Sequence, residues 1–167
     1  MKNTSQFSTC DFCDIYKSLD SSVFRVLPPI FQNFGALASF HGRVATLQCY
    51  EDNTYIKTAV ESPGESRVLV VDGGGSLRRS LLGGNLAAAA VLNGWAGLVI
   101  NGAVRDVAEL SRCDIGIMAL APIPMPTQRR KEGQPNIEIQ IEGIWVRPGD
   151  WLYADADGIV ISKKALI

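Results

Sequence analysis

The spacing of apolar and polar positions predicts strands that alternate with helices over the first two thirds of the chain. Short runs rich in β-branched residues, bounded by turn residues, indicate strands, whereas apolar positions three or four residues apart indicate helices. The predicted strands are residues 45–50, 67–71, 96–100 and 115–120. The predicted helices are residues 9–19, 55–61, 85–93 and 106–112, the third with Asn85 as N-cap and Gly94 after its end. This order is typical of an α/β protein with a central sheet and flanking helices.

The pattern changes in the last third of the chain. Residues 136–142 read Asn-Ile-Glu-Ile-Gln-Ile-Glu, a strict alternation that is typical of a half-solvated strand. Residues 144–146, 151–154 and 158–162 are further short apolar runs with turn residues between them. We therefore predict an antiparallel C-terminal portion. Neither an internal repeat nor a long linker interrupts the pattern, so residues 1–167 are expected to form one domain.

Composition narrows the classes of function. A formal net charge of −1, with 47% hydrophobic and 20% charged residues, is typical of a globular protein and argues against direct nucleic-acid binding. The one basic cluster, residues 129–131, is expected to be a solvated loop. The chain has neither a secretion signal at its start nor an apolar run of the roughly 20 residues that a membrane span requires. A cytoplasmic location with reduced cysteines is the expectation.

Two strand-loop-helix units carry the candidate chemistry. Gly83, Gly84, Asn85 and Leu86 open a predicted helix, where unpaired backbone N–H groups and the helix dipole favour an anion such as a carboxylate. After the next strand come Arg105 and Asp106, followed by Glu109, and both loops are expected at the same end of the sheet.

An arginine matches a carboxylate or enolate, and an aspartate is a hard oxygen ligand for a divalent cation. The alternative interpretation is that the glycines serve turns, that Arg105 and Asp106 form a surface ion pair, and that Glu109 lies on a solvated helix face.

The residues also carry a resemblance to a known family. The chain is similar to the RraA-like family, which includes regulators of ribonuclease activity and class II 4-hydroxy-4-methyl-2-oxoglutarate aldolases. The motifs that carry the resemblance are residues 68–78 (Val-Leu-Val-Val-Asp-Gly-Gly-Gly-Ser-Leu-Arg), 83–86 (Gly-Gly-Asn-Leu), 94–97 (Gly-Trp-Ala-Gly), 101–106 (Asn-Gly-x-x-Arg-Asp) and 151–158 (Trp-Leu-Tyr-Ala-Asp-x-Asp-Gly). The resemblance implies a β/β/α swivelling-domain fold, a homotrimer with sites near subunit interfaces, and a divalent cation such as Mg²⁺ or Mn²⁺.

Residue roles follow from the aldolase members of this family. The resemblance implies that Arg105 binds the carboxylate and keto oxygen of pyruvate, that Asp106 ligates the metal, and that Glu109 holds the metal through a water. Backbone groups of residues 83–86 would hold the small oxo-acid substrate. The implied reaction is retro-aldol cleavage, or loss of CO₂ from oxaloacetate, with metal and arginine stabilising the pyruvate enolate.

The chain departs from the aldolase pattern in two places. Counting 21 residues back from Arg105 gives Gly84, where the aldolases have an aspartate expected to handle a proton. Asp72, in the nearby glycine loop, is a candidate substitute. The chain also ends at Ile167, without the further acidic residue that some aldolases carry. Decarboxylation, which does not require a base to take a hydroxyl proton, is expected to tolerate these losses better than aldol chemistry.

The sequence also bears on two other functions. The front half, through residues 13–16, 31–35 and 49–53, resembles the regulator branch, so the alternative is a non-catalytic protein that inhibits a ribonuclease partner by protein–protein contact. A methyltransferase or nucleotide site on Gly73–Gly75 is not predicted, because Arg78 stands where the third glycine of a Gly-x-Gly-x-x-Gly motif belongs.

Overall fold

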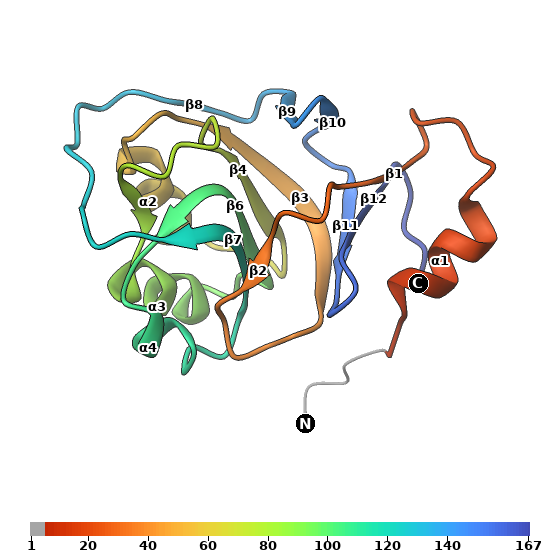
Figure 1. The fold of residues 1–167 in the computed structure, drawn as a ribbon, viewed down its shortest axis with the longest axis horizontal. Helices are drawn as coiled ribbons and strands as arrows, with labels where there is room; N and C mark the ends of the chain where they lie inside the picture. Colours follow the sequence, from red (N-terminus) through yellow and green to blue (C-terminus); the bar gives the residue numbers. More distant parts are fainter. Residues whose placement is uncertain (1–5) are drawn as a thin grey trace.

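A parallel sheet covered by helices forms one half of the protein. The computed structural model describes residues 6–167, and ten of the strands in that range join one sheet. Its four central strands are parallel, in the order β3 (Phe40–Gln48), β4 (Val68–Asp72), β6 (Gly97–Val104) and β7 (Gly116–Pro122). The connecting helices α2 (Thr54–Val60), α3 (Gly84–Leu92) and α4 (Val107–Leu110) gather on one side of this sheet (Figure 1).

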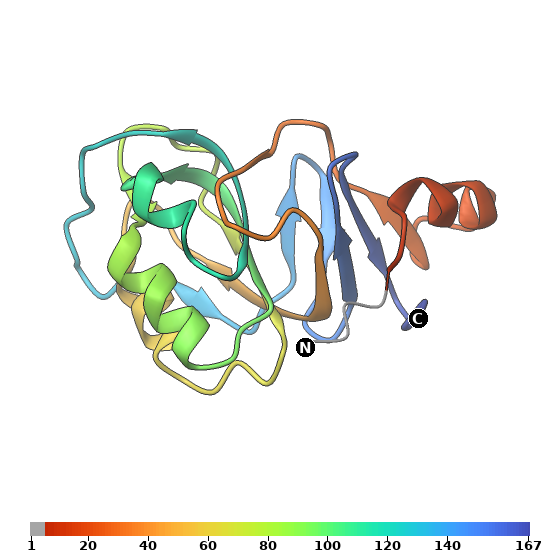
Figure 2. The ribbon, with the colours of Figure 1, turned by 90° about the horizontal axis from the view of Figure 1, so that it is seen from below.

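Antiparallel strands extend the sheet beyond β3. The added strands are β11 (Trp151–Ala154), β12 (Ile159–Ser162) and β1 (Phe24–Val26), and α1 (Thr9–Tyr16) lies outside them at the far end of the molecule (Figure 2). Three short strands pair at other places in the sheet: β2 (Gln32–Asn33) with β7, β5 (Ser80–Leu82) with β6, and β8 (Gln134–Pro135) with β3. A separate hairpin consists of β9 (Ile139–Ile141) and β10 (Ile144–Val146). The expected antiparallel C-terminal portion is therefore present.

The long strand β3 belongs to both halves. Its first residues, Phe40 to Arg43, pair with β11, and its last residues, Val44 to Gln48, pair in parallel with β4. The Phe40 ring lies over the paired glycines Gly97 and Gly116, where an added Cβ would overlap the ring. These two glycines therefore leave the space that lets one aromatic side chain join the two halves.

Alternating burial explains why the central strands read as continuous apolar runs. Leu69 and Val71 face the core under the helices, whereas Val68 and Val70 face a second core closed by the hairpin and β11. A strand buried on both faces needs apolar residues at successive positions. The predicted α/β class and the central strands are confirmed by this arrangement.

Several predicted boundaries were wrong. The first helix ends at Tyr16 rather than at residue 19, and α3 begins at Gly84 with Gly83 as its N-cap, so Asn85 is not the cap. The alternating stretch 136–142 yields only the three-residue strand β9, because Asn136 and Glu142 have positive φ angles of 60° and 47°. The fourth helix is likewise short, with Asp106 as its N-cap. None of the helices that the structure describes is long and apolar enough to cross a membrane.

Candidate functional site

The two predicted loops meet at the carboxyl ends of β5 and β6. The N–H of Arg105 donates to the carbonyl of Leu82 at 2.9 Å, which joins the loop after β6 to the last residue of β5. The N–H of Gly84 donates to Oδ2 of Asp106 at 2.9 Å. Asp106 reaches this position because its backbone is left-handed, with a φ of 59°. The structure thus brings Gly83, Gly84, Arg105 and Asp106 together, as the sequence predicted.

The charged side chains at this junction are open to solvent. Nε of Arg105 lies 4.0 Å from Oδ2 of Asp106, and the two side chains are 43% and 39% exposed. An exposed ion pair at this separation contributes little to stability. The guanidinium donors therefore remain available to an anionic ligand, and the remaining oxygen of Asp106 remains available to a cation.

Glu109 fills the space beside Gly84. A Cβ added at Gly84 would overlap the Glu109 carboxylate, and a Cβ added at Gly83 would lie 2.6 Å from Oδ2 of Asp106. The N–H of Glu109 donates to the carbonyl of Asp106 at 2.8 Å, which places this glutamate in the first turn of α4. The space beside position 84 is thus occupied by a carboxylate from the first turn of α4.

The first backbone N–H groups of α3 are not all unpaired, in contrast to the expectation from the sequence. The expectation was a set of unpaired N–H groups for a substrate carboxylate, but the Gly84 N–H already donates to Asp106. An anion at this helix end would therefore contact Asn85 and Leu86, one and two residues further along, beside the exposed Arg105. Of these two, Leu86 is buried and Asn85 is exposed.

The donor set suits a hard cation that keeps part of its water shell. Within residues 6–167 no three His, Cys, Asp or Glu side chains converge to hold a metal ion. Asp106 and Glu109 nevertheless both lie against the Gly83–Gly84 turn. Magnesium is commonly held by one or two carboxylates and several waters, whereas structural zinc requires four protein ligands. The pair therefore fits Mg²⁺ or Mn²⁺ better than zinc.

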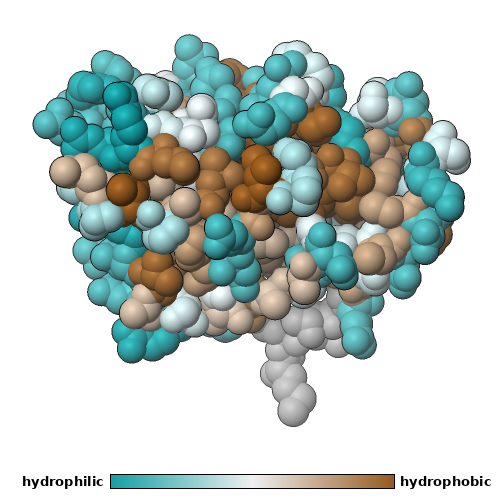
Figure 3. Space-filling view, in the orientation of Figure 1, coloured by the Kyte–Doolittle hydropathy of each residue, from teal (hydrophilic) through white to brown (hydrophobic). Residues whose placement is uncertain are grey.

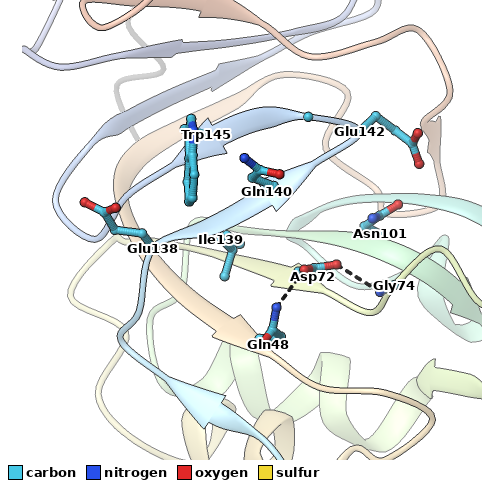
Figure 4. A pocket seen from close by; sticks show the side chains of 10 residues that line it. Gln48, Asp72, Gly74, Asn101, Glu138, Ile139, Gln140, Glu142 and Trp145 are labelled. Carbon is cyan, nitrogen blue, oxygen red and sulfur yellow. Dashed lines mark hydrogen bonds between the residues drawn. The ribbon is translucent and has the colours of Figure 1, made fainter.

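Asp72, the candidate substitute for the missing aspartate, is engaged elsewhere. Its Oδ1 accepts from the Gly74 N–H at 2.9 Å, and its Oδ2 accepts from Nε2 of Gln48 at 3.2 Å. It lines a hollow of about 440 Å³ together with Asn101 and the β9–β10 hairpin (Figure 4). Arg105, Asp106 and Glu109 do not line this hollow, so Asp72 lies apart from the junction of Gly84 and Asp106.

Sequence reasoning missed the support beneath the site. The short strand β5 was not predicted, although the carbonyl of its last residue, Leu82, accepts the hydrogen bond from the Arg105 N–H. Asn53 in turn holds β5: its Nδ2 donates to the carbonyl of Leu81 at 3.2 Å, and its Oδ1 accepts from Thr127 Oγ1 at 2.8 Å. The available signal was an amide side chain immediately before the predicted helix at residues 55–61.

Comparisons with known proteins agree with the fold and the motifs. A family model for RraA-like proteins, described as Aldolase/RraA, matches residues 9–161. A protein of Albidiferax ferrireducens is 56% identical, with 98% of this chain and 99% of that protein covered. A protein of Cupriavidus necator is 50% identical over 95% of this chain and 96% of that protein. Both are named "Putative 4-hydroxy-4-methyl-2-oxoglutarate aldolase".

Two solved structures share the whole fold. The RNA-processing inhibitor RraA from Thermus thermophilis superposes with a TM-score of 0.91 at 41% identity, covering 97% of this chain and 96% of that one. A structure from Geobacillus kaustophilus, titled S-adenosylmethionine:2-dimethylmenaquinone methyltransferase, gives 0.89 at 38% identity, with 96% and 97% covered. Sequence motifs, family model and fold all agree, and the chain belongs to the RraA-like family.

Proposed function

We propose that this protein is a divalent-metal-dependent lyase that releases pyruvate from a small oxo-acid, by retro-aldol cleavage of 4-hydroxy-4-methyl-2-oxoglutarate or by decarboxylation of oxaloacetate. The observation that carries the proposal is the junction at Gly84, where the Asp106 carboxylate accepts the backbone N–H at 2.9 Å beside an exposed Arg105. The names of the relatives at 50–56% identity support it.

The chain's own residues supply binding and orientation. Arg105 holds the carboxylate and keto oxygen of the pyruvyl group in its planar fork, and the backbone of residues 83–86 lies along the substrate. Asp106 and, through water, Glu109 would hold the divalent cation, which would supply Lewis-acid stabilisation of the negative charge on the pyruvate enolate. The hydrogen bond from Gly84 to Oδ2 orients the Asp106 carboxylate and leaves Oδ1 for the cation.

Glu109 takes the role of the absent aspartate. Retro-aldol cleavage requires a base to remove the proton of the substrate hydroxyl, and an intact carboxylate must stand close to the substrate to do so. The Glu109 carboxylate lies in the space that a side chain at position 84 would fill. Decarboxylation releases CO₂ without this proton transfer, so oxaloacetate turnover depends less on Glu109 than aldol cleavage does.

A homotrimer is part of the proposal. One face of the molecule carries a band of apolar surface across its middle, which an assembly would cover (Figure 3). Exposed large apolar side chains in the described chain include Leu92, which is 86% exposed, and Ile15, which is 66% exposed. Light scattering of the purified protein measures this directly, with a mass of three chains as the expected result.

The test of the proposed function is pyruvate release with each substrate. We expect turnover with Mg²⁺ or Mn²⁺, loss of turnover with a chelator, and recovery when metal is restored. The variant Glu109→Gln should lose aldol cleavage more than decarboxylation. If the wild type with metal releases pyruvate no faster than the Asp106→Ala variant, the protein is not a lyase of this kind.

A second candidate is inhibition of a ribonuclease by contact between proteins. The 41% identity and TM-score of 0.91 with the RNA-processing inhibitor RraA favour it. The exposed cluster of residues 129–131 lies in a loop, and Arg130 pairs with Glu132 at 3.5 Å, which argues against a surface for RNA itself. Co-purification with a ribonuclease, unaffected by Asp106→Ala, would separate this role from catalysis.

A further inference from the structure

The hollow that Asp72 lines has two walls. One wall consists of the carboxyl ends of β3 and β4 and of Asn101 in the middle of β6, and the other is the β9–β10 hairpin (Figure 4). The hairpin is fixed because Ile139, Ile141 and Val146 are buried in the same core as Val70 and Val99. The polar side chains of both walls therefore border a preformed hollow of about 440 Å³, within the range of small-molecule sites.

Asn101 is the unusual residue of this hollow. It ends an otherwise apolar stretch of β6 and is only 3% exposed, yet its Oδ1 has no hydrogen-bond partner in the described chain. Buried polar atoms of native proteins are normally hydrogen-bonded, because an unsatisfied acceptor loses its water without compensation. An acceptor left in this state at the wall of a hollow indicates a ligand that donates hydrogen bonds.

The charges of the hollow indicate a ligand with two positive ends. Asp72 on the strand wall accepts hydrogen bonds from Gly74 and Gln48, and no Lys, Arg or His among residues 6–167 forms an ion pair with it. Glu142, on the hairpin wall, is also without an ion pair in this range. Glu138 differs, because it is already paired with Nε of Arg147 at 3.1 Å.

A metal ion does not satisfy this hollow. Asp72 and Glu142, the two carboxylates of the hollow without an ion pair among residues 6–167, do not converge on one point. The two unpaired carboxylates lie on opposite walls, Asp72 at the end of β4 and Glu142 in the turn of the hairpin, with Asn101 between them in Figure 4. An organic dication spans such an arrangement, because its charged ends are separated by methylene groups.

We propose that this hollow binds a small aliphatic diamine. One ammonium group donates to the Asp72 carboxylate and to Oδ1 of Asn101, and the other donates to Glu142. The methylene chain crosses the hollow between the two walls. This site is distinct from the Arg105–Asp106 site, because no residue lining the hollow belongs to that site, and it does not depend on the proposed lyase activity.

The first experiment is titration calorimetry of the full-length protein with 1,4-diaminobutane at pH 7, in low salt and with a chelator present. We expect saturable binding that is at least tenfold tighter than binding of 1-aminobutane and that weakens as salt is added. A series from 1,3-diaminopropane to 1,6-diaminohexane should show one preferred length. Absence of saturable binding, or equal affinity for the monoamine, would overturn the proposal.

Matched variants locate the binding. Glu142→Gln and Asp72→Asn should each weaken binding at least tenfold, whereas Asp106→Ala should leave it unchanged. Glu65→Gln is the matched control, since Glu65 is also an exposed glutamate with a positive φ, 53° against 47°, but lies at the opposite end of β4. Glu142 is at the surface, so its variant tests the site even if Asp72→Asn fails to fold. A loss in Glu65→Gln equal to that in Glu142→Gln would show non-specific charge attraction and contradict the site.

Discussion

Asp72 and Asp106 occupy similar places but differ in what surrounds them. Each follows or ends a parallel strand at the same edge of the sheet, and each accepts a glycine N–H at 2.9 Å, from Gly74 and Gly84 respectively. The second oxygen of Asp72 is taken by Gln48 at 3.2 Å. The second oxygen of Asp106 has no such donor among the described residues, and a guanidinium lies 4.0 Å from the first.

This difference separates a carboxylate held in place from one left open. The loop after Asp72 is fixed further by Glu51, which accepts from Ser76 Oγ at 2.8 Å and from Arg78 Nη2 at 3.0 Å. The loop after β6 has no comparable clamp, and Arg105, Asp106 and Glu109 are all exposed. The two aspartates lie at the same edge of the sheet, but only Asp106 has both a neighbouring guanidinium and a free oxygen. These two features, rather than position alone, indicate a residue that can bind a ligand.

The strongest test of this comparison is the same substitution at both aspartates. We expect Asp106→Asn to lower kcat/KM for pyruvate release about 100-fold or more, because it weakens the cation's ligand. Asp72→Asn should stay within about threefold of the wild type, since its one amide oxygen still accepts from the Gly74 N–H and only the exposed bond from Gln48 is lost. Steady-state kinetics with saturating Mg²⁺ measures both. Equal losses at the two positions would remove the distinction drawn here.

Arg105 sharpens the comparison, because no arginine accompanies Asp72. Arg105→Lys keeps the charge but loses the planar fork, so we expect roughly a tenfold loss in kcat/KM, expressed mainly as a higher KM for oxaloacetate. Arg105→Ala should lose more. An unchanged KM in both variants would show that the guanidinium does not hold the substrate carboxylate.

Disturbing the contact between Gly84 and Glu109 should have a smaller effect on activity. A double variant shows whether the two residues act together. A methyl group at position 84 would overlap the Glu109 carboxylate. Gly84→Ala should therefore displace Glu109 and lower aldol cleavage several-fold, with a smaller loss of decarboxylation. In a Glu109→Ala background the same substitution has space, and its further cost should vanish. A full additive loss in the double variant would mean that the two residues do not act together.

The smallest expected effect concerns the loop after Asp72, which Glu51 fixes. Hydrogen bonds from Arg78 and Ser76 lower the pKa of the Glu51 carboxyl below its ordinary value. A carboxylate with a lowered folded-state pKa stabilises the fold fully above its unfolded-state value of about 4.3, and this stabilisation is lost as the pH falls through the lowered pKa. The Gly75 amide, which donates to the Asn101 carbonyl, should therefore lose protection from hydrogen exchange below about pH 4. The variant Glu51→Gln should lack this pH dependence.

The regular part of the fold was predictable because its signals are local. Strands buried on both faces, such as β4 and β6, appear in the sequence as apolar runs. Short strands carry no such period. The strand β5, three residues between Arg79 and Gly83, was not predicted, because only its pairing with β6 defines it. The Asn85 cap was wrong because the Asp106 carboxylate, from another loop, provides the acceptor that a capping side chain usually supplies.

The site was predictable in its members but not in its contacts. Family motifs and strand order indicated that residues 83–86 and 105–109 share one end of the sheet. That Glu109 fills the space at Gly84, however, depends on the left-handed backbone of Asp106, and no sequence pattern here specified it. Asn101 was passed over, although an amide at the end of the apolar run Gly97 to Ile100 was a visible signal.

The shared strand β3 also affects how the chain folds during its synthesis on the ribosome. Its last residues pair with β4, which emerges soon after it, but its first residues, from Phe40 to Arg43, pair with Trp151 to Ala154 near the end of the chain. Loop closure over such a separation is slow compared with local pairing. During synthesis the first residues of β3 therefore lack their β11 partner until residues 151–154 have been made, which leaves a long opportunity for chaperones that bind exposed strand edges.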